Sequence, residues 1–123
     1  MQSHTTLKPI LIIDDEEMVL GMMSQALATK GYHTDTASSG EDGIVKILSG
    51  DYSLVITDIQ MPGIQGTELV ARIKDTEKGD IPVIGISGTP WRLNEGLFDA
   101  VLSKPCPLKT LFASVEQFLS PSP

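Results

Sequence analysis

The sequence predicts an α/β protein of the (βα)5 type, in which a doubly wound, parallel five-stranded sheet carries helices on both faces. The first observation is that short apolar runs alternate with stretches in which apolar residues recur at helical spacing. The second is size, because 123 residues with 41% hydrophobic content match one ordinary domain with one core. Strands that alternate with helices pair in parallel through right-handed crossovers, and five such units fit this length.

The first half of the chain contains three strand–helix units. Residues 9–15 (PILIIDD) predict a strand that ends in acids, and residues 32–37 and 53–57 predict two more strands. Apolar residues at helical spacing predict the three helices: Val19, Met22, Met23, Ala26 and Leu27 for the first, Ile44, Ile47 and Leu48 for the second, and Leu69, Val70 and Ile73 for the third. Gly31 and Gly50 are the expected ends of the first two helices.

The second half of the chain is less regular. Residues 81–87 (IPVIGIS) predict the fourth strand, and residues 100–103 (AVLS) predict the fifth. Between them, residues 89–99 contain Pro90 and Gly96, which predict a shortened or irregular fourth helix. The last helix has the strongest apolar stripe of the chain: Leu108, Leu111, Phe112, Val115, Phe118 and Leu119.

The two ends of the chain are predicted to be tails. Residues 1–8 are polar, and residues 120–123 (SPSP) are typical of a tail or linker, so the expected domain covers residues 9–119. A net charge of −7 argues against binding nucleic acid through its phosphates. The single cysteine, Cys106, excludes an internal disulfide and a cysteine-based zinc cluster. Without a long apolar run or a signal peptide, we expect a cytoplasmic domain that does not enter a membrane.

Polar and charged residues stand where four of the predicted strands end. Asp14 and Asp15 close the first strand, Asp58 follows the third, Ser87 ends the fourth and Lys104 follows the fifth. The carboxyl ends of parallel strands meet at one edge of the sheet, where such folds bind ligands. Clustered carboxylates repel each other, and oxygen ligands without a thiol or imidazole favour Mg²⁺. A lysine and a hydroxyl beside that ion suit a phosphoryl group, which an aspartate can accept as nucleophile.

Each of these residues also has a structural interpretation when it is taken alone. Asp14 or Asp15 is a typical N-cap for the first helix, and Asp58 is a typical first residue of a turn. Ser87 is typical of a turn, and Lys104 is typical of a solvated surface. Their joint placement at successive strand ends favours a shared site over five separate roles.

Four motifs together resemble the receiver domain of two-component response regulators. They are IIDDEE at residues 12–17, VITDIQMPG at 55–63, VIGISG at 83–88 and LSKP at 102–105, in that order. The resemblance extends over about residues 9–119. It implies the flavodoxin-like strand order 2-1-3-4-5 and a role in two-component signal transduction. In such a role a phosphoryl group on an aspartate switches a protein-interaction surface.

The resemblance implies a role for each strand-end residue. Asp58 would take the phosphoryl group from a histidine kinase or a histidine phosphotransfer protein. Asp15 and Asp58 would bind Mg²⁺ directly, together with the backbone carbonyl of Gln60, and Asp14 would act through a bound water.

The other two residues would act on the phosphoryl group itself. Ser87 would donate a hydrogen bond to it, and Lys104 would form an ion pair with it. The peptide bond between Lys104 and Pro105 would be cis.

The sequence departs from the usual receiver pattern at three places. Serine replaces threonine at position 87, which keeps the hydroxyl. Valine stands at position 101, where many receivers have an aromatic side chain that reports phosphorylation. The stretch from Ser87 to Lys104 is shorter than usual. These departures predict an intact acceptor site with an altered output surface.

Three other functions remain as alternatives. The first is a receiver-like docking module that is not phosphorylated. The second is a Mg²⁺-dependent phosphatase, which would need an acid at Gln60. The third, flavin binding, lacks a phosphate-binding loop after the first strand. We expect an acceptor without turnover of an external substrate. It would act through a downstream protein, a fused effector domain or a homodimer.

Overall fold

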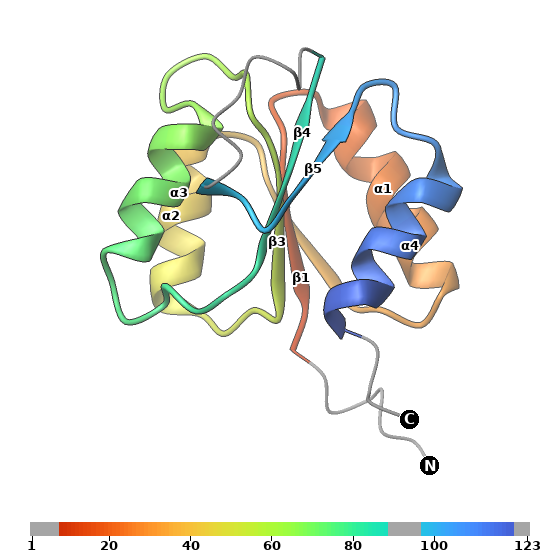
Figure 1. Cartoon of the computed structure of the whole chain (residues 1–123), viewed down its shortest axis with the longest axis horizontal. Helices are drawn as coiled ribbons and strands as arrows, with labels where there is room; N and C mark the ends of the chain where they lie inside the picture. Colours follow the sequence, from red (N-terminus) through yellow and green to blue (C-terminus); the bar gives the residue numbers. More distant parts are fainter. Residues whose placement is uncertain (1–7, 89–96, 120–123) are drawn as a thin grey trace.

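Five parallel strands form one sheet in the order β2-β1-β3-β4-β5 in the computed structural model, which describes residues 8–88 and 97–119 (Figure 1). The strands are β1 (Ile10–Ile13), β2 (Thr34–Ala37), β3 (Leu54–Asp58), β4 (Val83–Ser87) and β5 (Ala100–Ser103). This order and the parallel pairing confirm the predicted fold class. The order also places the ends of β1, β3 and β4 beside one another at one edge of the sheet.

Helices cover both faces of the sheet in the described part of the chain. They are α1 (Glu17–Thr29), α2 (Gly40–Ser49), α3 (Gly66–Lys74) and α4 (Leu108–Leu119). Figure 1 shows α1 and α4 on one face and α2 and α3 on the other. The irregular fourth helix predicted over residues 89–99 falls mainly on residues 89–96, which lie outside the described residues. Within the described ranges, the helices are too short and too polar for any of them to cross a membrane.

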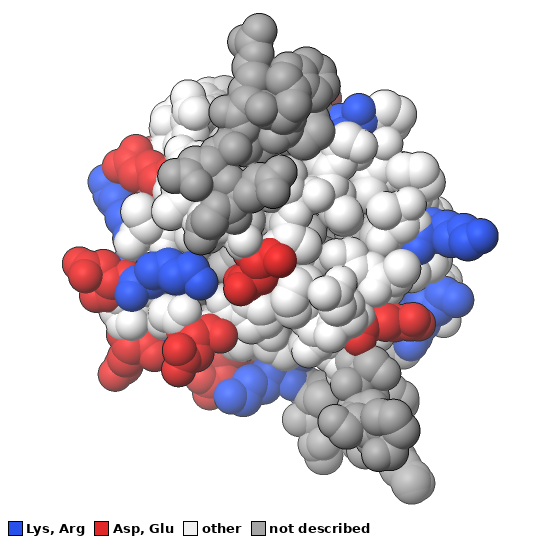
Figure 2. Space-filling view, viewed as in Figure 1, with Lys and Arg blue, Asp and Glu red and all other residues white. Residues whose placement is uncertain are grey.

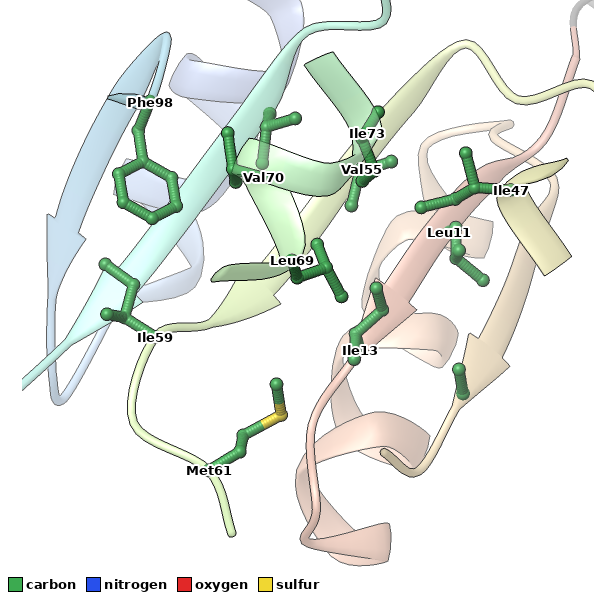
Figure 3. Close-up of a cluster of buried hydrophobic side chains, with 12 residues drawn as sticks. Leu11, Ile13, Ile47, Val55, Ile59, Met61, Leu69, Val70, Ile73 and Phe98 are labelled. Atoms are coloured by element: carbon green, nitrogen blue, oxygen red, sulfur yellow. The ribbon is translucent and has the colours of Figure 1, made fainter. Parts of the chain in front are cut away.

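Alternating side chains of the central strands divide the core into two layers. Ile10, Ile12 and Ile56 belong to the layer under α1 and α4. Leu11 and Val55 belong to the layer under α2 and α3, part of which is drawn in Figure 3. Because β1 and β3 are covered on both sides, all their residues are buried. This explains why their sequences are continuous apolar runs.

The buried faces of two helices differ from the predicted stripes. The buried residues of α1 are Leu20, Met23 and Leu27, whereas the side chain of Met22 is 52% exposed and that of Met18 is 88% exposed. A turn of 100° per residue rotates Met22 away from the line through Leu20 and Leu27. The prediction that Met22 lies on the buried stripe is therefore wrong.

A similar rotation occurs in α2. Ile47 and Gly43 face the core, while Leu48 is 49% exposed, so the predicted inward position of Leu48 is wrong. The predicted helix ends are close to the observed ones, because α2 ends before Gly50 and α1 ends shortly before Gly31, which has a φ of 91°.

Candidate functional site at the carboxyl edge of the sheet

Three carboxylates meet at the carboxyl edge of the sheet. Oxygen atoms of Asp14, Asp15 and Asp58 lie within 4.8 Å of one another. Asp14 directly follows β1 and Asp58 is the last residue of β3, so the pairing of these two strands brings the acids together. Asp14 is 3% exposed and Asp58 is 4% exposed, whereas Asp15 is on the surface. The cluster is thus half inside the protein and open at one side.

Lys104 connects the cluster to the fifth strand. Its ammonium Nζ lies 3.0 Å from Oδ2 of Asp58, and its backbone N–H donates to the carbonyl of Ser87 at 2.8 Å. Ser87 is fully buried at the end of β4, which pairs with β3 next to Asp58. The bond from Lys104 to Pro105 is cis, as predicted. The structure therefore brings Lys104 onto Asp58, and it places Ser87 on the neighbouring strand end.

Backbone N–H groups hold two of the carboxylates in place. Oδ1 of Asp14 accepts from the N–H of Glu16 at 2.9 Å, and Oδ1 of Asp58 accepts from the N–H of Gln60 at 3.2 Å. The N-cap residue of α1 is Glu16, so neither Asp14 nor Asp15 caps that helix. The structural interpretation of these acids as helix caps is thereby excluded.

A close contact with Gly66 fixes the backbone that carries Asp58. The N–H of Gly66 donates to the carbonyl of Ile59 at 2.8 Å. A Cβ atom at Gly66 would lie 2.7 Å from Cα of Ile59 and 2.9 Å from the carbonyl oxygen of Asp58. Only glycine allows the loop to close this tightly behind the aspartate. The acid is therefore held on rigid backbone, which favours reactions that depend on positioning.

Within residues 8–88 and 97–119, three acids of the cluster stand against one lysine, Lys104. The pKa of Asp14 is raised to about 6, chiefly by burial and also by the charges of Asp58 and Asp15, although the Glu16 N–H and Lys104 act in the opposite direction. Burial alone would lower the pKa of Lys104, but the hydrogen bond and charge of Asp58 outweigh burial, and the pKa is raised. This arrangement keeps Lys104 charged and leaves excess negative charge in the cluster.

An apolar groove lies beside Lys104, and the sequence analysis did not predict it. It has a volume of about 600 Å³ and is lined by residues of α1, the end of β4 and the cis-proline loop: Glu16, Val19, Met22, Met23, Ile86, Lys104, Pro105 and Cys106. Met18 stands fully outward on the same helix. The available signal was the group of three methionines in α1, Met18, Met22 and Met23, of which the structure buries only Met23.

A parallel sheet of order 2-1-3-4-5 with an acid pair, a strand-terminal aspartate and a lysine before a cis-proline defines a receiver-type signalling domain. Residues 10–116 match the family model described as the response regulator receiver domain. The chain therefore belongs to this family and is a receiver domain of the response-regulator type.

Several known proteins are similar to the chain over most of its length. The response regulator ArlR of Staphylococcus aureus is 30% identical over 117 residues, which cover 93% of this chain and 53% of that protein. The chain thus spans about half the length of the curated relatives it matches. The response regulator TrrA of Thermotoga maritima, solved in complex with Mg²⁺-BeF, is 34% identical with a TM-score of 0.84, covering 92% of this chain and 100% of that one.

TrrA has also been solved in complex with the histidine kinase ThkA. That receiver chain is 34% identical to this one with a TM-score of 0.83, covering 93% of this chain and 100% of that one. A receiver domain protein from Methanospirillum hungatei is 30% identical with a TM-score of 0.81, covering 91% of this chain and 93% of that one.

Proposed function

We propose that Asp58 accepts a phosphoryl group from a phosphohistidine on a histidine kinase or a histidine phosphotransfer protein. The observation that carries the proposal is the buried Asp58 carboxylate, held among Asp14, Asp15 and the ammonium group of Lys104. One oxygen of Asp58 attacks the phosphorus, and a new P–O bond forms as the P–N bond of the donor breaks. The electron pair of the broken bond stays on the imidazole nitrogen. Asp58 reacts as a carboxylate and gives up no proton.

Lys104 and Ser87 act on the group once it is attached. The Lys104 ammonium, now 3.0 Å from the Asp58 carboxylate, then pairs with the phosphoryl oxygens. The hydroxyl of Ser87 donates a hydrogen bond from the neighbouring strand end. These contacts draw the ends of β4 and β5 toward Asp58, and we propose that they change the surface through which the domain meets its downstream partner.

The residues at this edge fit a divalent metal ion. Three carboxylates within 4.8 Å of one another, with the pKa of Asp14 raised to about 6, form an oxygen-rich cluster of the kind that binds Mg²⁺. Asp15, Asp58 and the carbonyl of Gln60 would hold the ion directly, and Asp14 would hold it through a water. When bound, Mg²⁺ supplies positive charge for the oxygens of the phosphoryl group. The Mg²⁺-BeF complex of TrrA supports this assignment.

A mass measurement tests the acceptor role. The chain is incubated with acetyl phosphate, with and without Mg²⁺, and its intact mass is recorded. We expect a gain of one phosphoryl group that needs Mg²⁺ and is lost in Asp58→Asn but kept in Asp80→Asn, a matched change of an exposed acid in the connection before β4. No gain in a folded chain that binds Mg²⁺ would favour the non-phosphorylated docking module. Continued consumption of acetyl phosphate without labelled chain would indicate an enzyme.

The apolar groove beside Lys104 is the proposed contact for the phosphoryl donor. It adjoins the acceptor, and Met22 in its lining is 52% exposed. The complex of TrrA with a histidine kinase supports a donor of this class. A donor protein that places apolar side chains in the groove would bring its phosphohistidine to Asp58.

A variant pair separates docking from chemistry. We expect Met22→Glu to slow phosphoryl transfer from a phosphorylated histidine phosphotransfer protein, while labelling by acetyl phosphate stays unchanged. Leu48→Glu on α2 is the matched control, because Leu48 is 49% exposed and lies on the opposite face of the sheet. Equal slowing by both variants would contradict the groove as docking surface.

A further inference from the structure

The side chain that follows the acceptor in sequence points toward a buried aromatic ring. Ile59, bonded directly to Asp58, is 2% exposed, and Phe98, two residues before β5, is 7% exposed. Both belong to the core layer under α2 and α3. Figure 3 shows the ring of Phe98 directed toward Ile59 from the β5 side of the sheet. A residue next to the acceptor thus faces a residue that leads into the fifth strand.

Gly85 makes this approach possible. A Cβ atom at Gly85 would lie 2.6 Å from Cδ1 of Ile59 and 2.9 Å from Cδ1 of Phe98. The two side chains therefore converge in the space that a side chain at position 85 would fill. Gly85 pairs with Thr57 on β3 and with Val101 on β5. The two side chains therefore meet over β4, the strand that lies between the strand of Asp58 and the fifth strand.

Hydrogen bonds hold Ile59 and the residue after Phe98 to β4. The N–H of Ile59 donates to the carbonyl of Ile86 at 3.0 Å. On the other side, the N–H of Asp99 donates to the carbonyl of Val83 at 2.9 Å, and Oδ2 of Asp99 accepts from the N–H of Val83 at 2.7 Å. Because Ile59 and the chain next to Phe98 are held to β4 in a closely packed core, we expect a shift of one side chain to press on the other.

We infer that Ile59 and Phe98, meeting over Gly85, couple the state of Asp58 to the segment that leads into β5. The inference rests on the proposed phosphorylation of Asp58. A phosphoryl group adds charge and acceptor oxygens next to Ile59. Val101 of β5 is partly buried and packs against the same core layer. Phe98 is therefore the aromatic side chain that we expect to report the state of Asp58.

Fluorine NMR on the full chain tests the coupling. The chain has three phenylalanines, and Phe112 and Phe118 pack in the other core layer on α4, so they serve as internal references. All three are labelled with fluorophenylalanine and assigned by single replacement with leucine. On addition of Mg²⁺ and beryllium fluoride, which mimics the phosphoryl group, we expect the Phe98 resonance to shift more than the other two.

Removing one methyl group from Ile59 tests whether its contact with Phe98 carries the coupling. Ile59→Val removes Cδ1, the atom nearest to the gap at Gly85. We expect this variant to bind beryllium fluoride but to lose most of the Phe98 shift. Ile73→Val removes the same atom elsewhere in the layer and should keep the shift.

The outcomes distinguish the coupling from the proposed function. Bound beryllium fluoride with an unmoved Phe98, or a Phe98 shift that survives in Ile59→Val, would overturn the coupling alone. The second result would mean that the added charge acts on the ring directly through space. Absence of a bound fluoride signal, as expected for Asp58→Asn, would overturn the acceptor role and the coupling with it.

Discussion

Two clusters of charged side chains shift the pKa values of their carboxylates in opposite directions. At the carboxyl edge of the sheet, Asp14, Asp15 and Asp58 lie together, and Lys104 is the lysine that pairs with them, through Asp58, among the described residues. The second cluster is the Asp35 network, which consists of Asp35 on β2 and three partners. The partners are the Tyr52 hydroxyl at 2.8 Å, the Thr36 N–H at 2.9 Å and the Lys46 ammonium at 3.5 Å. In the part of the chain that the structure describes, one lysine faces the three acids of the first cluster, whereas in the second cluster a single acid has three partners.

The pKa values record this difference. The pKa of Asp14 is raised to about 6, chiefly by burial. Burial would also raise the pKa of Asp35, but the hydrogen bonds from Tyr52 and Thr36 and the charge of Lys46 outweigh it, and the pKa is lowered. Ionised Asp14 therefore opposes folding, whereas ionised Asp35 supports it. Negative charge that the fold does not compensate is left for a ligand to compensate, which is how a binding site differs from a structural network.

The largest expected effect comes from removing the charge of Asp14. The pKa of Asp14 is about 6 in the folded chain and 3.8 as the ordinary value, so stability falls as pH rises between these values and stays reduced above them. Asp14→Asn keeps an oxygen for the Glu16 N–H. We expect it to raise the free energy of unfolding by about 1–3 kcal/mol at neutral pH, from the pKa difference at about 1.4 kcal/mol per unit. Urea unfolding with a metal chelator measures this.

Two conditions separate charge from packing in that experiment. Below pH 3.8, where Asp14 is protonated in both states, the gain should vanish. With Mg²⁺ at one hundred times its dissociation constant, the unsubstituted chain should gain about 2.7 kcal/mol and the variant less. Asp80→Asn, which removes an exposed acid, is the matched control. A variant that is less stable at neutral pH would contradict the idea that the cluster is destabilising.

The strand-end acids could be predicted because topology alone brings them together. Once β1 and β3 are neighbours in a parallel sheet, their carboxyl ends must meet, and Asp14 and Asp58 are the residues at those ends. The buried faces of the helices were harder to predict from the sequence than the strand ends. More apolar residues of α1 have helical spacing than its buried face holds, so the periodicity did not exclude Met22. The groove that Met22 lines was missed for the same reason.

Contacts between separate elements could not be predicted. Tyr52 and Asp35 are 17 residues apart, on either side of α2, and nothing in their local sequence indicates a hydrogen bond. Likewise, Gly85 within β4 resembles any small residue in a buried strand. Its role depends on Ile59 and Phe98, which come to it from two other parts of the chain.

A smaller effect is expected when the Asp35 network loses one donor. Tyr52→Phe removes the hydroxyl that donates to Oδ2 of Asp35. We expect a loss of about 1 kcal/mol of unfolding free energy at neutral pH, the usual contribution of such a bond. Because the folded pKa of Asp35 is lowered, its contribution is present above its unfolded pKa and disappears as pH falls through the folded value. The loss should therefore shrink in acid.

Relative to the unsubstituted chain, Tyr52→Phe lowers the unfolding free energy at neutral pH and Asp14→Asn raises it, and both differences shrink in acid. Urea unfolding at several pH values, compared with the unsubstituted chain, measures them. Tyr32→Phe makes the same change at the other tyrosine, which packs against the opposite core layer and whose pKa is influenced by Glu116, and it should leave the acid dependence unchanged. A Tyr52→Phe loss that stays constant into acid would show that the hydroxyl acts through packing and not through the Asp35 charge.

The smallest effect is expected at an ion pair that neither cluster includes. On the face shown in Figure 2, acidic and basic side chains lie together over α3, where Glu68 and Arg72 pair at 2.8 Å with side chains 51% and 55% exposed. Water already solvates both charges, so we expect Glu68→Gln to lower the unfolding free energy by about 0.3–0.5 kcal/mol at low salt. The difference should disappear in high salt, because exposed pairs are screened. Asp14→Asn, Tyr52→Phe and Glu68→Gln each remove one charge or one donor. We therefore attribute the order of their effects on the unfolding free energy to the surroundings of the group that is removed. A Glu68→Gln effect as large as that of Tyr52→Phe would mean that pairing matters wherever it occurs, and the distinction between a charge-unbalanced site and a balanced network would lose its basis.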